Sequence, residues 1–216
     1  MMNNLFSSFD PCTGHLSMNW ISSMMIILMF PYSFWTTKSN SSLIISLMIK
    51  ELYKEMKTLN KKKGSSLMFI SLFFMILFIN IMGILPYVFT SSSQLVFSMS
   101  LALPMWISWM MFGWINKTSK MLIHLVPMGT PYILMPLMVL IETISNLIRP
   151  GSLSVRLSAN MIAGHIIMSL LGSNSEMIPM ITLMVLFMIL LSFESAVAII
   201  QAYVFMTLST LYSSEI

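Results

Sequence analysis

The sequence predicts an all-α integral membrane protein, with about five membrane-crossing helices and one interfacial amphipathic helix. Of its 216 residues, 57% are hydrophobic and only 8% are charged, too few charges to cover a soluble globule of this size. The hydrophobic residues form runs long enough to cross a bilayer, and lysines gather beside these runs. We therefore expect a single membrane domain spanning residues 1–216, whose last two helices are long and strongly tilted.

Charge and cysteine content exclude several other classes of protein. The net charge is +4, but nine of the eleven basic residues are lysines grouped beside hydrophobic spans, which indicates membrane orientation and no nucleic-acid partner. Cys12 is the only cysteine, so no intrachain disulfide is possible and a cysteine-based metal site is not expected. The sequence contains no nucleophile triad, phosphate loop, paired-histidine metal helix or dinucleotide fingerprint. We predict no catalytic, cofactor-binding or metal site.

The N-terminal quarter predicts an arm, a span and a surface helix. Turn-forming pairs in residues 1–17 indicate a short polar arm, and residues 18–35 form the first span candidate. Residues 43–63 carry lysines on one face and apolar side chains on the other, which favours an interfacial amphipathic helix. The lysines are Lys50, Lys54, Lys57 and Lys61, and the apolar positions are Ile45, Ile49, Leu52, Met56 and Leu59.

The rest of the chain predicts two helical hairpins. No charged side chain occurs between residues 64 and 116, and turn residues divide this stretch into spans at 67–85 and 95–115. The second hairpin, residues 134–171 and 177–212, would have helices of about 50 Å in about 30 Å of hydrocarbon. Both helices must therefore tilt strongly, or break at Pro136 and at Pro150-Gly151. Lysines on alternate loops indicate five crossings, with residues 50–63, Lys117 and Lys120 on one side.

The stretch Val155 to His165 places an arginine inside a predicted membrane helix. A guanidinium does not lose its proton, and burying it near a bilayer centre costs roughly 3 kcal/mol on insertion scales. On a helix, Arg156 shares one face with the small or polar residues Ala159, Asn160, Ala163 and Gly164. Small residues allow another helix to approach closely, so we expect a fixed positive charge at a tight contact. The alternative is an arginine paired internally for structural reasons.

Further ionisable residues accompany Arg156 in the second hairpin. Glu142 and Arg149 precede it at intervals of seven, whereas His165 points to another side of the helix. Such a set indicates a proton or ion path, and the alternative is a buried network that only holds helices together.

If the chain folds back between residues 172 and 179, the two helices of the hairpin run side by side in opposite directions. A residue of one helix then lies opposite a residue of the other when their two numbers add up to about 351. Arg156 would then lie across from Ser195, with Glu194 and Gln201 nearby.

At these residues the chain resembles the subunit a family of F-type ATP synthases, in its mitochondrial form. The resemblance covers most of the chain from about residue 67 onward and is strongest in VRLSANMIAGH and in the IQAYVF block. The other matching segments are residues 80–86 (NIMGILP), Gly129-Thr-Pro131, IETIS with Arg149-Pro150, and ESAVAIIQAYVF from Glu194 to Phe205.

The resemblance implies a proton-translocating stator subunit in the mitochondrial inner membrane, multi-pass and not catalytic alone. It implies that two half-channels load and unload the carboxylates of a rotating c-ring, and that the other partners are membrane-sector subunits, peripheral-stalk subunits and lipid. The implied roles are as follows: Arg156 faces the ring carboxylate, Asn160 and Gln201 are its polar neighbours, His165 and Glu194 line the half-channel from the intermembrane space, and Glu142 belongs to the matrix-side path.

Two departures from the family pattern stand out. Met128 replaces a common glutamine, and Arg149 occupies a position that is often neutral, so Glu142 could gain an additional salt-bridge partner. Two other functions remain open from the residues. One is a secondary transporter in which Arg156 binds an anionic substrate, and the other is a purely structural membrane subunit.

Overall fold

The computed structural model describes residues 5–12, 17–25, 27, 30–31, 35–60, 64–85, 88–126, 129–173 and 179–215, and its secondary-structure elements there are all helices. No strand occurs in these ranges, which confirms the predicted all-α class. The elements are η1 Leu5–Phe9, η2 Met18–Met25, α2 Asn40–Leu59, α3 Ser65–Ile84, η3 Ser91–Ser93, α4 Leu95–Asn116, α5 Thr118–Leu125, η4 Tyr132–Leu134, α6 Met135–Ser173 and α7 Met180–Glu215.

Four of the described helices, α3, α4, α6 and α7, are long and apolar enough to cross a membrane. They match the predicted hairpins to within a few residues at each end. The predicted first span, residues 18–35, falls partly outside the described residues, and Met18–Met25 forms a 3-10 helix. Five crossings therefore remain a prediction.

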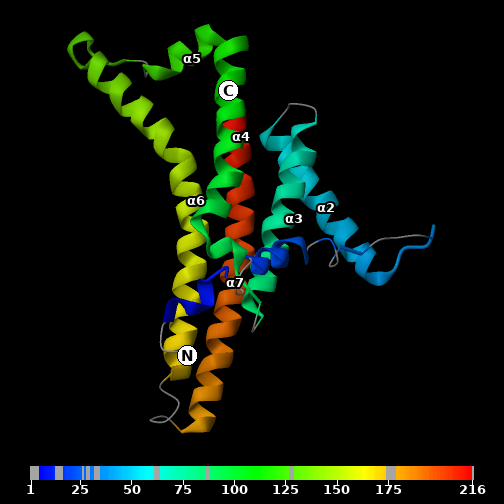
Figure 1. Ribbon diagram of the computed structural model, residues 1–216. Coiled ribbons are helices and arrows are strands. Elements are labelled where there is room, and N and C mark those ends of the chain that lie inside the picture. The colour runs from blue at the N-terminus through cyan, green and yellow to red at the C-terminus, as the bar shows by residue number, and fades with distance from the viewer. Residues whose placement is uncertain are drawn as a thin grey trace.

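Helix α3 lies at the centre of the bundle and packs most extensively against α7 (Figure 1). Its buried side chains are large and apolar, among them Phe69, Phe73 and Ile76. Along α7 the buried positions Ala198 and Ala202 are four residues apart and carry no bulky side chain. Because small residues let helix backbones approach closely, this row brings α7 against α3.

Helix α6 runs unbroken from Met135 to Ser173, so the break considered at Pro150-Gly151 does not occur. Pro136 sits in the first turn, where a proline removes no helical hydrogen bond. Pro150 is buried within the helix, where its missing N–H leaves the carbonyl group four residues earlier without its helical donor. Figure 1 shows α6 running beside α7 in its lower half and leaning away above, a change of direction that we attribute to Pro150.

Helix α2 buries the apolar face that its periodicity predicts. Ser39 caps its N-terminus, since its side chain accepts a hydrogen bond from the Ser42 backbone N–H. Met56 is fully buried, and the partly buried Ile45, Ile49 and Leu52 pack against the core. The fifth predicted position, Leu59, lies at the last turn and is exposed.

The lysine-bearing segments lie at one end of the bundle, as the sequence predicts. Asn60, directly after α2, donates a hydrogen bond from Nδ2 to Ser213 Oγ at 2.5 Å, which joins this segment to the end of α7. In Figure 1 the C-terminus and α5, which follows Lys117, lie at this same end. Residues 61–63, at the predicted end of the amphipathic helix, and residues 174–178, in the predicted fold-back, lie outside the described residues.

Candidate functional site

Arg156 is exposed on α6, together with Ala159 and Ala163 on the same face. In the described part of the chain it makes no hydrogen bond or ion pair, so the structure does not support the alternative of an internally paired arginine. Asn160 and Gln201, which the family resemblance implies as its polar neighbours, are half-buried. The combination is a permanently charged guanidinium on a face of small residues, within an apolar helix.

Glu194 lies on α7 and packs against Gly164 of α6. A methyl group at Gly164 would stand 1.9 Å from Oε1 of Glu194 and 2.7 Å from its Cδ, so only glycine leaves room for this carboxyl group. Both carboxyl oxygens are buried and have no hydrogen-bond partner. Buried polar groups are almost always paired, and those that are not require an explanation such as a functional role.

The contact between Gly164 and Glu194 corrects the predicted register of the hairpin. The numbers of these two residues sum to 358, whereas folding about residues 172–179 had indicated about 351. The helices are displaced along each other, so Gln201 lies closer than Ser195 to the level of Arg156. Glu194 is instead at the level of Gly164, about 12 Å along α6 from Arg156.

His165 and Asn80 accompany Glu194 in this part of the bundle. His165 follows Gly164, and its Nε2 is also buried without a partner. Asn80 of α3 is fully buried and donates from Nδ2 to the Ala198 carbonyl oxygen at 3.4 Å, one turn beyond Glu194. The Asn80 Oδ1 is a further buried atom without a partner. These three buried polar groups come from three helices and lie within about one helical turn of one another along the bundle.

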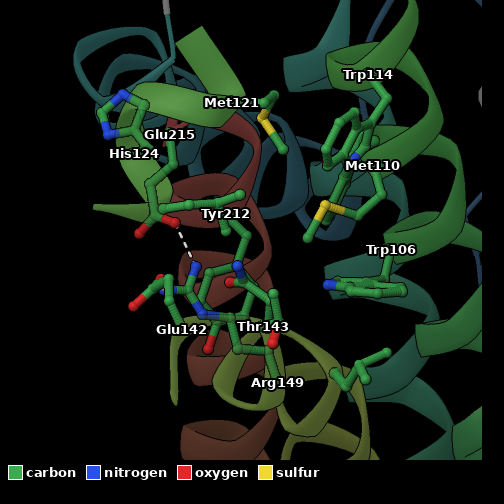
Figure 2. Close-up of a pocket in the computed structure, with 14 residues that line it drawn as sticks. Trp106, Met110, Trp114, Met121, His124, Glu142, Thr143, Arg149, Tyr212 and Glu215 are labelled. Atoms are coloured by element: carbon green, nitrogen blue, oxygen red, sulfur yellow. Dashed lines mark hydrogen bonds and ion pairs between the residues drawn. The ribbon is translucent and has the colours of Figure 1, made fainter. Parts of the chain in front are cut away.

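A second polar region surrounds Arg149 near the lysine-bearing end. Its guanidinium pairs with Glu142, with 3.8 Å between Nη2 and Oε1, and with Glu215 of α7. It also lies over the ring of Tyr212, 5.0 Å from the ring centroid. This confirms the additional partner for Glu142 that the sequence suggested. Figure 2 shows the guanidinium between the two carboxylates, with Tyr212 beside it.

The Arg149 region forms one wall of a cavity of about 600 Å³ between α4, α5, α6 and α7. Figure 2 shows Trp106 and Trp114 of α4 opposite Glu142 and Arg149. His124 of α5, which is exposed, lines the same cavity. The lining of the cavity is mostly apolar, and Glu142, Arg149 and Glu215 supply charged groups on its wall.

Sequence reasoning missed several contacts around these two regions. Asn80 appeared only as part of a family motif, and nothing local to it indicates that it faces Ala198. Glu215 lies beyond the predicted end of the last helix, and the seven-residue stripe of Glu142 and Arg149 does not point to it. Phe9, whose ring contacts the ring of His165, lies in an arm that had no predicted role.

A family model described as ATP synthase A chain matches residues 16–214. The chain belongs to this family. It is 54% identical over 224 residues to an ATP synthase subunit a of Locusta migratoria, and 53% identical over 225 residues to one of Drosophila simulans. It is 52% identical over 225 residues to an ATP synthase subunit a of Anopheles quadrimaculatus, and each alignment covers 100% of both chains.

Membership of the ATP synthase A chain family confirms the resemblance drawn from the VRLSAN and IQAYVF blocks. The chain is a membrane-sector subunit of an ATP synthase, working within that complex rather than as an enzyme alone. Together with the four apolar helices, the similarity to insect subunits confirms the expected multi-pass location in the mitochondrial inner membrane.

Proposed function

We propose that this chain is the proton-translocating stator subunit of the F-type ATP synthase membrane sector. It provides two half-channels that load and unload the carboxylates of a rotating c-ring, and it thereby couples proton flow to ATP synthesis. The observation that carries the proposal is an exposed Arg156 without an internal partner, located between two separate polar regions on the same helix.

The spacing along α6 supports two half-channels rather than one continuous pore. Glu142 precedes Arg156 by 14 residues and His165 follows it by 9, distances of about 21 Å and about 14 Å along a helix. Between the two regions α6 buries Leu157 and Met161 together with Ser154 and Ser158, whose hydroxyls donate to carbonyl groups of α6 itself. Arg156 is the only ionisable side chain of α6 between Arg149 and His165, so in this proposal the proton passes to a group outside this chain.

Arg156 cannot itself release a proton, but its fixed charge can control the protonation of such an external group. A guanidinium favours the ionised form of a carboxylate brought beside it, which helps the carboxylate to release its proton. It also repels a proton that moves directly between the half-channels. Moving one charge through 100 mV is worth about 2.3 kcal/mol, so an uncoupled path would waste the driving force. Asn160, one turn further along α6, and Gln201 of α7 are the polar neighbours assigned to Arg156 in this proposal.

The two regions take opposite roles in this proposal. His165 and Glu194 receive protons from the intermembrane space, on the side of the N-terminal arm. Glu142 and the cavity beside it release protons to the matrix, on the side of the lysines, as the positive-inside rule favours. The c-ring covers the Arg156 face, other membrane-sector and peripheral-stalk subunits contact the remaining surface, and lipid covers exposed apolar side chains such as Leu140 and Ile144.

Substitutions at Arg156 test the proposal. Lysine retains the charge but has a compact, strongly hydrated head in place of a planar fork. We expect Arg156→Lys to assemble but to synthesise little ATP, and Arg156→Ala to let protons cross without coupled synthesis. Proton flux and ATP synthesis are measured in vesicles containing each assembled complex. Lys120→Ala, which removes an exposed positive charge from α5, is the matched control.

Each alternative function predicts a different result. A transporter would lose binding of its substrate in both variants, and a purely structural subunit would fail to assemble. Wild-type coupling in Arg156→Ala would refute the role proposed for Arg156.

A further inference from the structure

The N-terminal arm is seated on α6 at His165. The ring of Phe9 meets the imidazole of His165 edge to face, with centroids 6.2 Å apart and an angle of 86° between the planes. The side chain of Gln94, at the start of α4, donates a hydrogen bond from Nε2 to the Phe9 carbonyl oxygen at 2.7 Å. Figure 1 shows this first segment lying against the lower half of α6.

Long-range contacts hold the arm in this place. Gln94 is 85 residues from Phe9, and its side chain is half-buried. It follows η3, whose three serines are buried. The next carbonyl in the arm, that of Asp10, accepts a hydrogen bond from Asn19 Nδ2 at 3.2 Å. Two successive backbone carbonyls are thus fixed by side chains from other parts of the chain, and the Phe9 ring is directed toward α6.

The chemistry of Phe9 restricts what it can do at this site. A phenyl ring has no proton to donate and no acceptor for a hydrogen bond, so Phe9 cannot itself carry a proton. It can exclude water from one side of the imidazole and can fix the plane of the ring, because aromatic pairs prefer edge-to-face geometry. The Nε2 of His165 is buried without a partner, so the direction of this atom is set by packing.

We propose that Phe9 is a positioning residue for His165, and that residues 5–10 form the outer wall of the His165–Glu194 site. The hydrogen bond from Gln94 to the Phe9 carbonyl oxygen keeps this wall in place. The effect on proton uptake rests on the proposed function, whereas the seating of the arm does not. Glu194 of α7 packs against Gly164, which precedes His165, and Asp10 follows Phe9 in the arm, where it is exposed.

Chemical labelling of histidine tests the wall independently of proton transport. The intact complex is treated with diethyl pyrocarbonate, and labelling of His165 is measured by mass spectrometry relative to His124, which is exposed on α5. We expect Phe9→Ala to increase relative labelling of His165 by about two- to tenfold, the range set by the strength of an aromatic pair. Gln94→Met, which keeps the shape but removes the donor, should increase it as well.

Phe6→Ala is the matched control. It removes a phenyl ring from the same arm, but Phe6 is 68% exposed and its ring contacts Phe9 rather than His165. We expect labelling close to wild type in this variant. Unchanged labelling of His165 in Phe9→Ala, or an equal increase in Phe6→Ala, would overturn the proposal that residues 5–10 form a wall at this site.

A second measurement tests the positioning role. Proton uptake should be slower in Phe9→Ala and should be restored in Phe9→Tyr, which retains the ring. Increased labelling with unchanged uptake would overturn the positioning role of Phe9. Glu194→Gln, measured in parallel, separates this outcome from a failure of the proposed function, because it tests the uptake path without altering the arm.

Discussion

Gly164→Ala is expected to displace the Glu194 carboxyl group while leaving the helices in place. The new methyl group would stand 1.9 Å from Oε1, 2.7 Å from Cδ and 2.8 Å from Cγ of Glu194. To restore ordinary van der Waals contact at 3.4 Å, the carboxyl oxygen must retreat by about 1.5 Å. The clashing atoms all belong to one flexible side chain, so a rotamer change relieves the contact without separating α6 from α7.

The expected consequence is a loss of proton transfer rather than a loss of assembly. A misplacement of about 1 Å can lower the rate of a reaction about 100-fold. We therefore expect proton-driven ATP synthesis by Gly164→Ala to fall by at least about tenfold, with normal amounts of complex on native gels. The assay is ATP synthesis in reconstituted vesicles under an imposed proton gradient, normalised to the amount of complex.

Two other glycines of α6 provide matched controls. A methyl group at Gly151 or Gly172 would meet no atom within 4 Å, so alanine at either position should retain wild-type synthesis. Wild-type synthesis in Gly164→Ala as well would refute the reasoning, because the contact between Glu194 and Gly164 would then be irrelevant to transport. Loss of the complex would also contradict it, since the helices and not the carboxyl group would have moved.

Three further predictions concern titration, ion pairing and topology. Replacing Glu194 with Gln removes a proton-carrying group, so proton uptake should slow at every pH tested while native gels show intact complex. Unchanged ATP synthesis would indicate that Glu194 has only a structural role. Arg149→Gln breaks the pairs with Glu142 and Glu215, whose side chains are 38% and 54% exposed, so it should cost no more than about 1 kcal/mol. Thermal inactivation of the solubilised complex should show this loss at low salt and not at high salt, and a loss independent of salt would exclude the electrostatic explanation. The only cysteine, Cys12, is exposed and should react with an impermeant maleimide added on the intermembrane-space side. Labelling solely from the matrix side would contradict the predicted topology.

Local patterns along the chain determined the features that depend on neighbours in sequence. Composition and the length of the apolar runs predicted the all-α membrane class and the bounds of both hairpins. The spacing of Ile45, Ile49, Leu52 and Met56 predicted the buried face of α2. The spacing of Arg156, Ala159 and Ala163 predicted that these residues share one face of α6, because helix periodicity is a local property.

Only the tertiary structure decided how these local features meet. Sequence spacing could not predict how far α7 is displaced along α6. This displacement depends on the packing of the Glu194 side chain against Gly164. It could not show whether Pro150 breaks a helix, because the outcome depends on how neighbouring helices support it. The pairing of Arg149 with Glu215 joins residues 66 apart, and Phe9 reaches His165 from an arm without helical periodicity. Periodicity determines which face a residue occupies, whereas side-chain packing between distant segments determines which faces are in contact.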